Sequence, residues 1–154
     1  NGVGQEFSPG GTDDMEAFRR SKGLPQRFVL FVGTLEPRKN LALLIRAYDR
    51  WQAQAAKSDQ DVKLVLAGAK GWYYERIFQE VRNLAREEDV LFPGFVPSAE
   101  LPDWYRAAEG FVYPSMFEGF GLPDKFDDRQ RYTAIDKWKE WYLSVRPNAV
   151  ITLQ

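Results

Sequence analysis

The stretch RFVLFVGTLEPRKNLALL, residues 27–44, decides the fold class of this chain. It opens with the run RFVLFVG, in which apolar side chains occupy successive positions until Gly33 ends the run. Such a run is typical of a strand buried on both faces, as in a parallel sheet. After the loop TLEPRK a helix is predicted from Asn40, whose side chain suits the N-cap position.

The helix predicted from Asn40 has an apolar stripe at helical spacing, formed by Leu41, Leu43, Leu44, Ala47, Tyr48 and Trp51. The alternation of strand and helix then repeats. Further strands are predicted at residues 62–67, 89–93 and 110–113, and further helices at residues 72–86 and 98–108. This order indicates an α/β fold, a parallel sheet with flanking helices and right-handed crossovers.

The length of 154 residues suits one domain with a short appendage. Residues 1–26 are rich in glycine and polar side chains and are expected to form a linker with one short helix. Residues 27–123 form the expected domain. Residues 124–154 are polar and aromatic and are expected to form an atypical helical tail on the same domain. The tail helix is predicted at residues 129–145, and residues 149–153 suit either a fifth strand or a frayed end.

Composition and charge exclude several classes of function. The 21 basic and 22 acidic side chains give a net charge of −1, which argues against a dedicated nucleic-acid binder. The chain contains neither cysteine nor histidine, so thiolate zinc sites, histidine metal sites and serine–histidine catalysis are excluded. The adjacent carboxylates at residues 13–14 and 127–128 lack the spacing of a calcium loop, and no metal site is predicted. No stretch approaches the roughly 20 apolar residues of a membrane span, and nothing marks export, so a cytoplasmic protein is expected.

Three loops after predicted strands are candidate ligand sites, because ligands of open α/β sheets bind beyond the carboxyl ends of the strands. The first loop carries four candidate residues, Gly33, Thr34, Arg38 and Lys39. Its two cations stand beside a helix start, which suits a phosphate or diphosphate, although a solvated basic turn has the same composition. The second loop carries Gly94, Phe95 and Val96, which suit either a flat slot for a nucleobase or ordinary packing.

The third loop, residues 114–123, contains the sequence EGFGLP from Glu118 onward. Two glycines around a phenylalanine allow the backbone to approach a ligand closely, and Glu118 is suited to accept hydrogen bonds from sugar hydroxyls. A solvated glutamate is the alternative. The loop is neither a Walker loop nor a dinucleotide fingerprint.

Taken in this order, several segments resemble the nucleotide-sugar-binding C-terminal domain of GT-B glycosyltransferases, and in particular the retaining group 1 enzymes of bacterial polysaccharide and lipopolysaccharide synthesis. The segments are FVGTLEPRKNLALLIRAY, KLVLAGAKGW, VLFPGFVPSAELPDWYRAAEGFVYPS and FEGFGLP. The similarity runs from Asn1 to about Pro123. It implies a Rossmann-like domain, one half of a GT-B fold, that binds a nucleoside diphosphate sugar such as a UDP- or GDP-sugar. The implied reaction is glycosyl transfer with retention, without a metal or other cofactor.

The resemblance also implies roles for the loop residues. Lys39 would neutralise the donor diphosphate, with Arg38 beside it, and Thr34 stands where the family commonly has an arginine after the glycine. Gly94, Phe95 and Val96 would frame the base. Glu118 would be the catalytic residue near the donor sugar, the first of the family's paired glutamates. The four residues after it, Gly119, Phe120, Gly121 and Leu122, would offer backbone N–H groups to sugar and phosphate.

Two departures from the family pattern limit the expected activity. The second glutamate of the pair belongs eight positions after Glu118, where this chain has Phe126, and residues 124–154 match nothing in the family. The family also places the acceptor in an N-terminal domain, and this chain opens where that domain would end. We therefore expect a donor-binding half, as a fragment or a truncated or fused product, with little activity alone. The acceptor domain would be lost or lie on another chain.

A second hypothesis comes from another class of function. The chain could be a non-catalytic scaffold or interaction module that kept the fold and lost its ligand. Its exposed aromatic contacts would then be those of the tail, Trp138, Trp141 and Tyr142. A small complete hydrolase or reductase is disfavoured by the absent histidine and cysteine and by the lack of a dinucleotide fingerprint.

Overall fold

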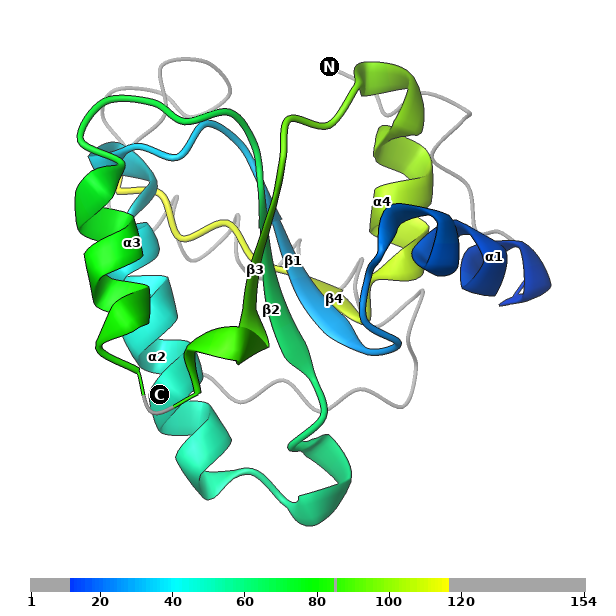
Figure 1. The fold of residues 1–154 in the computed structure, drawn as a ribbon, viewed down its shortest axis with the longest axis horizontal. Helices are drawn as coiled ribbons and strands as arrows, with labels where there is room; N and C mark the ends of the chain where they lie inside the picture. The colour runs from blue at the N-terminus through cyan, green and yellow to red at the C-terminus, as the bar shows by residue number, and fades with distance from the viewer. Residues whose placement is uncertain (1–11, 85, 117–154) are drawn as a thin grey trace, which may run out of the picture. The chain divides into compact units, whose positions relative to one another are not determined.

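The computed structural model describes residues 12–84 and 86–116, and these form a parallel sheet with helices on both faces (Figure 1). The strands are β1 (Phe28–Val32), β2 (Lys63–Ala67), β3 (Val90–Gly94) and β4 (Gly110–Phe111). The α-helices are α1 (Thr12–Lys22), α2 (Leu41–Gln54), α3 (Glu75–Arg82) and α4 (Leu101–Ala107), and short 3-10 turns precede α2, β2, β3 and α4. The predicted tail helix and fifth strand lie outside the described residues.

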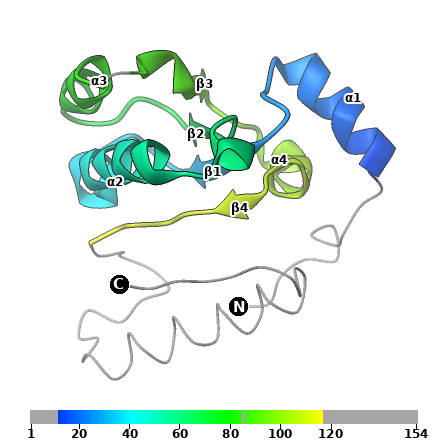
Figure 2. The same cartoon turned by 90° about the horizontal axis from the view of Figure 1, so that it is seen from below.

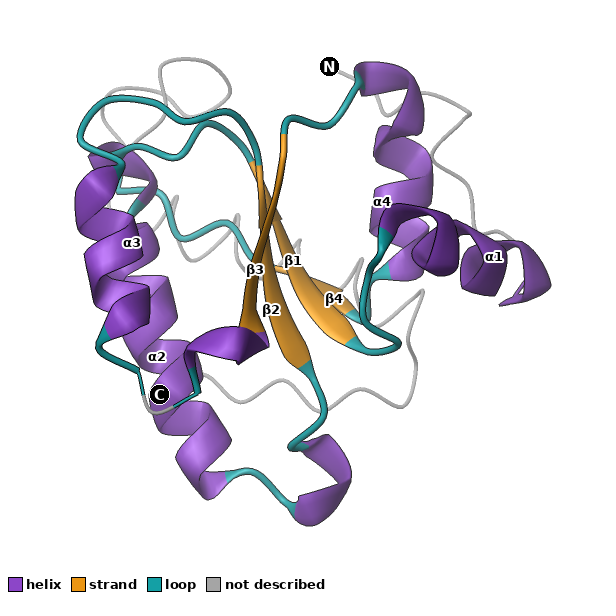
Figure 3. Ribbon diagram, viewed as in Figure 1, coloured by secondary structure: helices purple, strands orange, loops and turns teal. Residues whose placement is uncertain are grey.

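The sheet order is β3-β2-β1-β4, and every neighbouring pair is parallel (Figure 3). The apolar run of the opening stretch becomes β1, which is central, with Phe28 paired with Lys63 and Val32 with Ala67. The predicted α/β class and the parallel sheet with flanking helices are therefore confirmed. The fourth strand is shorter than predicted, since only Gly110 and Phe111 pair with β1.

Alternate residues of β1 enter two different apolar clusters, one on each face of the sheet. Phe31 packs with the helices α2 and α3, through residues such as Ile45 and Ile77. Leu30 packs with α1 and α4, through residues such as Trp104. Figure 2 shows the same arrangement, with α2 and α3 on one side of the strands and α1 and α4 on the other. Burial on both faces explains why β1 has no polar position.

The face of helix α2 that packs on the sheet differs from the apolar stripe that the sequence predicts. Its buried residues are Leu41, Ile45, Tyr48 and Gln52. Leu43 and Trp51, which the prediction placed on the stripe, are 50% and 41% exposed. The prediction was wrong at these positions because Gln52, a polar residue, replaces Trp51 on the inner face, where its amide is held by hydrogen bonds.

Asn40 precedes α2, but it does not cap the helix with its side chain. Its backbone is left-handed, with φ 56°, and its N–H donates to the carbonyl of Pro37 at 2.9 Å. The 3-10 turn Pro37–Lys39 therefore leads straight into α2, and asparagine is a residue that tolerates the left-handed conformation. The predicted side-chain cap is wrong for this reason.

The short helix expected within residues 1–26 is present as α1, which packs against α4. Met15 is buried, and the rings of Phe18 and Trp104 meet edge to face at 6.0 Å. The guanidinium of Arg19 donates two hydrogen bonds to the carbonyl of Ala107, at 3.0 and 2.8 Å. These contacts join α1 to the Rossmann-like core.

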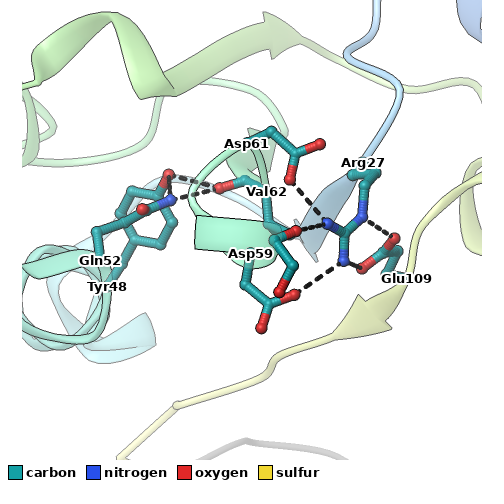
Figure 4. A network of polar contacts seen from close by, with 8 residues as sticks. Arg27, Tyr48, Gln52, Asp59, Asp61, Val62 and Glu109 are labelled. Carbon is teal, nitrogen blue, oxygen red and sulfur yellow. Dashed lines mark hydrogen bonds and ion pairs between the residues drawn. The ribbon is translucent and has the colours of Figure 1, made fainter. Parts of the chain in front are cut away.

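Polar contacts join the amino ends of the strands, opposite the carboxyl ends where ligand sites are expected (Figure 4). Arg27, just before β1, pairs with Glu109 at 2.6 Å, with Asp61 at 2.7 Å and with Asp59 at 3.3 Å. It also donates to the carbonyl of Ser58. The hydrogen bonds that the guanidinium donates to Glu109, together with the nearby carboxylates, raise the pKa of Arg27, which stays charged. One side chain thus ties the starts of β1, β2 and β4 together.

Candidate functional site

The loops that follow the first three strands meet at the carboxyl ends of the strands, which we call the carboxyl edge of the sheet. The N–H of Gly33 donates to the carbonyl of Ala67 at 2.9 Å, and that of Gly68 donates to the carbonyl of Gly94 at 2.7 Å. The loop after β1 is held to the loop after β2, since the N–H of Leu35 donates to the Ala69 carbonyl at 2.9 Å. The first and second predicted loops are therefore brought to one edge.

Gly68 allows this close approach, although the sequence analysis did not place it in the site. A Cβ atom on Gly68 would lie 1.8 Å from the carbonyl oxygen of Gly33, which no side chain can do. Gly94 needs glycine for another reason, because its φ is 88°. A glycine at the end of each of the first three predicted strands was the signal for this edge. Why a glycine is required at position 68 becomes clear only from the pairing of β1 with β2, which brings Gly33 close to it.

Lys39 is buried at the start of α2 and does not form a solvated basic turn. Its side chain is 5% exposed, and its ammonium donates a hydrogen bond to the hydroxyl of Tyr113 at 2.7 Å. The ammonium also lies 4.9 Å from the centre of the Tyr113 ring. Arg38, the other cation of the loop, is half-buried and pairs with Glu36 at 2.5 Å. Thr34 is exposed on the same loop.

Tyr113, like Gly68, is a residue of this site that the sequence analysis missed. It stands two residues after β4, and β4 lies beside β1, so the loop that carries Lys39 is its neighbour. The carbonyl of Arg38 also accepts the N–H of Met116 at 3.0 Å, which joins the loop after β4 to the loop after β1. An aromatic residue at a strand end was the available signal, but the sheet order was needed to interpret it.

The second loop divides its predicted site residues between surface and core. Phe95 is 74% exposed beside Gly94, whereas Val96 is 7% exposed and belongs to the apolar cluster of α1 and α4. The side chain of Val96 therefore has a packing role, and only its backbone is available to a ligand. Phe95 keeps its ring at the surface, where a flat ligand could stack on it.

The predicted residues of the third loop lie mostly outside the described part of the chain. Glu118, Gly119, Phe120, Gly121 and Leu122 all follow Met116, where the description ends. The start of that loop is placed at the same edge by the Met116 hydrogen bond. The assignment of Glu118 as the catalytic residue therefore stays a prediction.

Exposed large apolar side chains gather on the carboxyl-edge loops. They are Trp72, Tyr73, Phe95, Tyr113 and Met116, whereas the two others in the described chain, Leu43 and Trp51, lie on α2. Tyr73 also has a left-handed backbone, with φ 52°. Single exposed apolar residues are ordinary, but a concentration on one edge is typical of a surface that meets a ligand or another domain.

Residues 12–84 and 86–116 lack two kinds of feature. No group of three acidic, histidine or cysteine side chains there is placed to hold a metal ion. Within the same ranges, no helix has the length and apolar character that crossing a membrane requires.

The parallel sheet, the helices on both faces and the glycine-lined carboxyl edge define a Rossmann-like α/β domain. Comparison with known sequences identifies the family within this class. The pattern of the glycosyl transferases group 1 matches residues 14–123, and the chain belongs to that family.

Two of the similar proteins are sugar transferases by name. The O-antigen chain mannosyltransferase B of Escherichia coli is 42% identical over 98 residues, which cover 64% of this chain and 25% of that protein. The N-acetylgalactosamine-N,N'-diacetylbacillosaminyl-diphospho-undecaprenol 4-alpha-N-acetylgalactosaminyltransferase of Campylobacter jejuni is 40% identical over 98 residues, which cover 63% of this chain and 24% of that protein. This chain thus spans about a quarter of the length of these relatives.

Solved structures agree with the fold. The C-terminal domain of LpcC, a group 1 family protein of Francisella tularensis, aligns with a TM-score of 0.65 and 26% identity, covering 79% of this chain and 63% of that chain. HepE of Anabaena, solved in complex with UDP and glucose, aligns with a TM-score of 0.60 and 23% identity, covering 75% and 30%. The present chain is therefore similar to a C-terminal domain of this family.

Proposed function

We propose that this chain is the donor-binding domain of a glycosyltransferase and that a nucleoside diphosphate sugar binds at the carboxyl edge of its sheet. The buried ammonium of Lys39 carries the proposal. Lys39 is 5% exposed, and its hydrogen bond to the Tyr113 hydroxyl holds a positive charge at the carboxyl ends of the strands, where it suits a charge-assisted hydrogen bond to a diphosphate. Lys39 stands directly before α2, where backbone N–H groups and the helix dipole also favour an anion.

The surrounding residues fit the parts of such a ligand. Lys39 and Arg38 would contact the diphosphate, with the exposed Thr34 beside it, and the glycines at the strand ends let the backbone come close. Phe95 would stack on the base, and the backbone of Val96 would bond its edge. HepE, a structural neighbour, was solved with UDP and glucose, which supports this choice of ligand class. Glu118 and residues 119–122 would contact the sugar.

The proposed reaction breaks the bond between the anomeric carbon and the diphosphate oxygen and forms a bond from that carbon to an acceptor hydroxyl oxygen, whose proton passes to the leaving diphosphate. The leaving diphosphate gains negative charge, which Lys39, Arg38 and the start of α2 would stabilise without a metal ion. Retaining transfer also requires an acceptor held close to the sugar in a closed site. The matched region covers only 25% of the Escherichia coli relative, and we propose that the acceptor is held by a domain outside this chain. Turnover by this chain alone should therefore be far below that of the whole enzymes, and a turnover assay with donor and acceptor would test this.

The binding test is a thermal-shift titration with UDP, GDP and ADP, followed by calorimetry with the nucleotide that binds. A ligand at 100 times its Kd stabilises a protein by about 2.7 kcal/mol. Lys39→Ala should weaken binding by about tenfold or more, because a charged hydrogen-bond partner of the diphosphate is lost. Lys57→Ala is the matched control, since Lys57 is exposed and stands just before β2, at the opposite edge of the sheet.

The missing second glutamate should make the wild-type affinity modest, because Phe126 cannot accept a hydrogen bond from the ribose. If the protein melts cooperatively and no nucleotide shifts the transition, donor binding is wrong. The alternative of a scaffold that lost its ligand would then take its place.

A further inference from the structure

Tyr113 is held firmly at the carboxyl edge of the sheet by two other rings. Its ring stacks on that of Phe31 with centres 5.7 Å apart and an angle of 15°, and on that of Phe111 at 5.9 Å and 20°. Phe31 is fully buried in β1, and Phe111 belongs to β4. The phenol of Tyr113 is thus anchored to the two strands that frame this part of the edge, although the residue is 44% exposed.

The anchored phenol restrains the ammonium of Lys39 in two ways. The hydroxyl oxygen accepts a hydrogen bond from the ammonium at 2.7 Å, and the ring face lies 4.9 Å from the same charge. Lysine is a flexible side chain whose charge can occupy many positions, so both contacts reduce the freedom that binding would otherwise have to remove.

We propose that Tyr113 is a positioning residue, which holds the charge of Lys39 in place before the donor arrives. This inference rests on the proposed function, because it names the residue that orients the diphosphate-binding lysine. A pre-oriented charge binds its counter-ion more tightly than a mobile one, since less side-chain freedom is lost on binding. Tyr113 acts through Lys39 and needs no contact with the reacting atoms.

Tyr113→Phe is the informative variant, because it keeps the stacked ring and removes only the hydroxyl. Calorimetry should compare the nucleoside diphosphate that binds wild type with the corresponding nucleoside, for Tyr113→Phe, Lys39→Ala and the double variant. We expect Tyr113→Phe to weaken diphosphate binding about 3–10-fold and to leave nucleoside binding unchanged. In the Lys39→Ala background the same substitution should change the affinity less than twofold.

Tyr74→Phe is a matched control. The ammonium of Lys70 lies 4.9 Å from the Tyr74 ring, the same distance as in the Lys39 pair, but within the described part of the chain no hydrogen bond joins Lys70 to the Tyr74 hydroxyl. Tyr74→Phe should leave both affinities unchanged. A general effect of a lost tyrosine hydroxyl would appear in both variants.

A second readout needs no nucleotide. The rate at which acetic anhydride acetylates Lys39 in the free protein, followed by mass spectrometry, should rise severalfold in Tyr113→Phe and stay the same in Tyr74→Phe. Unchanged or tighter diphosphate binding in Tyr113→Phe, or an equal loss in the Lys39→Ala background, would overturn the positioning role while leaving the proposed function intact. No binding to wild type would overturn the proposed function and the donor role of Tyr113 with it, and the acetylation rates would still report whether Tyr113 restrains Lys39.

Discussion

The hydroxyl of Tyr48 lies in the interior of the domain, where it makes hydrogen bonds to Val62 and Gln52. It donates to the carbonyl of Val62 at 2.9 Å and accepts from the amide of Gln52 at 2.9 Å, and that amide also donates to Val62 at 2.7 Å. Burial raises the pKa of the phenol to about 12, and the Gln52 hydrogen bond lowers it only in part. The residue therefore links the inner face of α2 to the start of β2.

This pKa makes a prediction about alkaline stability. The phenol ordinarily ionises near pH 10, so between pH 10 and 12 the folded state keeps a proton that the unfolded chain releases. The stability from Tyr48 is complete below pH 10 and is lost as the pH rises through 12, by about 2–3 kcal/mol in the free energy of unfolding. Urea melts of wild type and Tyr48→Phe between pH 9 and 12 should show a steeper fall for wild type. Parallel curves would contradict the shifted pKa.

Gly68 makes a prediction about close packing at the site. Gly68→Ala would force the ends of β1 and β2 apart, because its Cβ would meet the Gly33 carbonyl at 1.8 Å, and we expect a loss of about 1–3 kcal/mol together with weaker nucleotide binding. Gly23→Ala is the control, since Gly23 has a φ of +64° with open space around it. It should lose about 1–2 kcal/mol from backbone strain and keep nucleotide binding. Denaturant melts and calorimetry separate the two effects, and equal nucleotide affinities would contradict the role of Gly68.

At the scale of an element, α2 shows how one helix serves both the core and the site. Its inner face packs on the sheet through Ile45, which is fully buried, while Leu43 on the outer side is 50% exposed. Its first turn begins at Leu41, two residues after Lys39. The packing of the inner face thus determines where the lysine and the start of the helix stand relative to the strand ends.

The two faces of α2 can be compared with one pair of substitutions. Ile45→Ala should lower the free energy of unfolding by about 2–5 kcal/mol, because it leaves a cavity between α2 and the sheet. Leu43→Ala removes a side chain of the same size from the surface and should change stability by about 0.5 kcal/mol or less. Urea denaturation followed by circular dichroism measures both. A larger loss for Leu43→Ala than for Ile45→Ala would mean that the helix faces the sheet with the stripe expected from the sequence.

At the scale of the whole domain, the two apolar clusters share the central strands. Leu30 belongs to the cluster of α1 and α4, and its neighbour Phe31 belongs to the cluster of α2 and α3. Neither cluster can lose its packing without exposing one face of β1. The described part of the chain should therefore unfold as one cooperative unit.

Native-state hydrogen exchange tests this cooperativity. Leu30→Ala and Ile45→Ala remove side chains from opposite faces of the sheet, yet each should lower the protection of the most protected amides in both β1 and β2 by the same free energy as in its denaturant melt. Protection that falls on one face alone would show that the two layers open separately.

The amino-acid pattern by itself determined the class of the fold, the strand and helix order and the family resemblance. Strands buried on both faces and glycines at their ends are local features, and local features can be recognised along a chain. The buried face of α2 was missed, because Gln52 enters the core through hydrogen bonds to Tyr48 and Val62 that no periodicity reports. Tyr113 was missed as a partner of Lys39 because the hydrogen bond between them depends on the sheet order, which periodicity does not report either.

Only the tertiary structure decided which strand ends lie together. The order β3-β2-β1-β4 places the loop after β4 beside the loop after β1, so two residues 74 positions apart share a hydrogen bond. The same pairing converts Lys39 from a charge in a polar loop into a buried ammonium held by a phenol. Contacts between distant segments depend on how the sheet is assembled, and the local sequence around Lys39 or Tyr113 carries no record of that assembly.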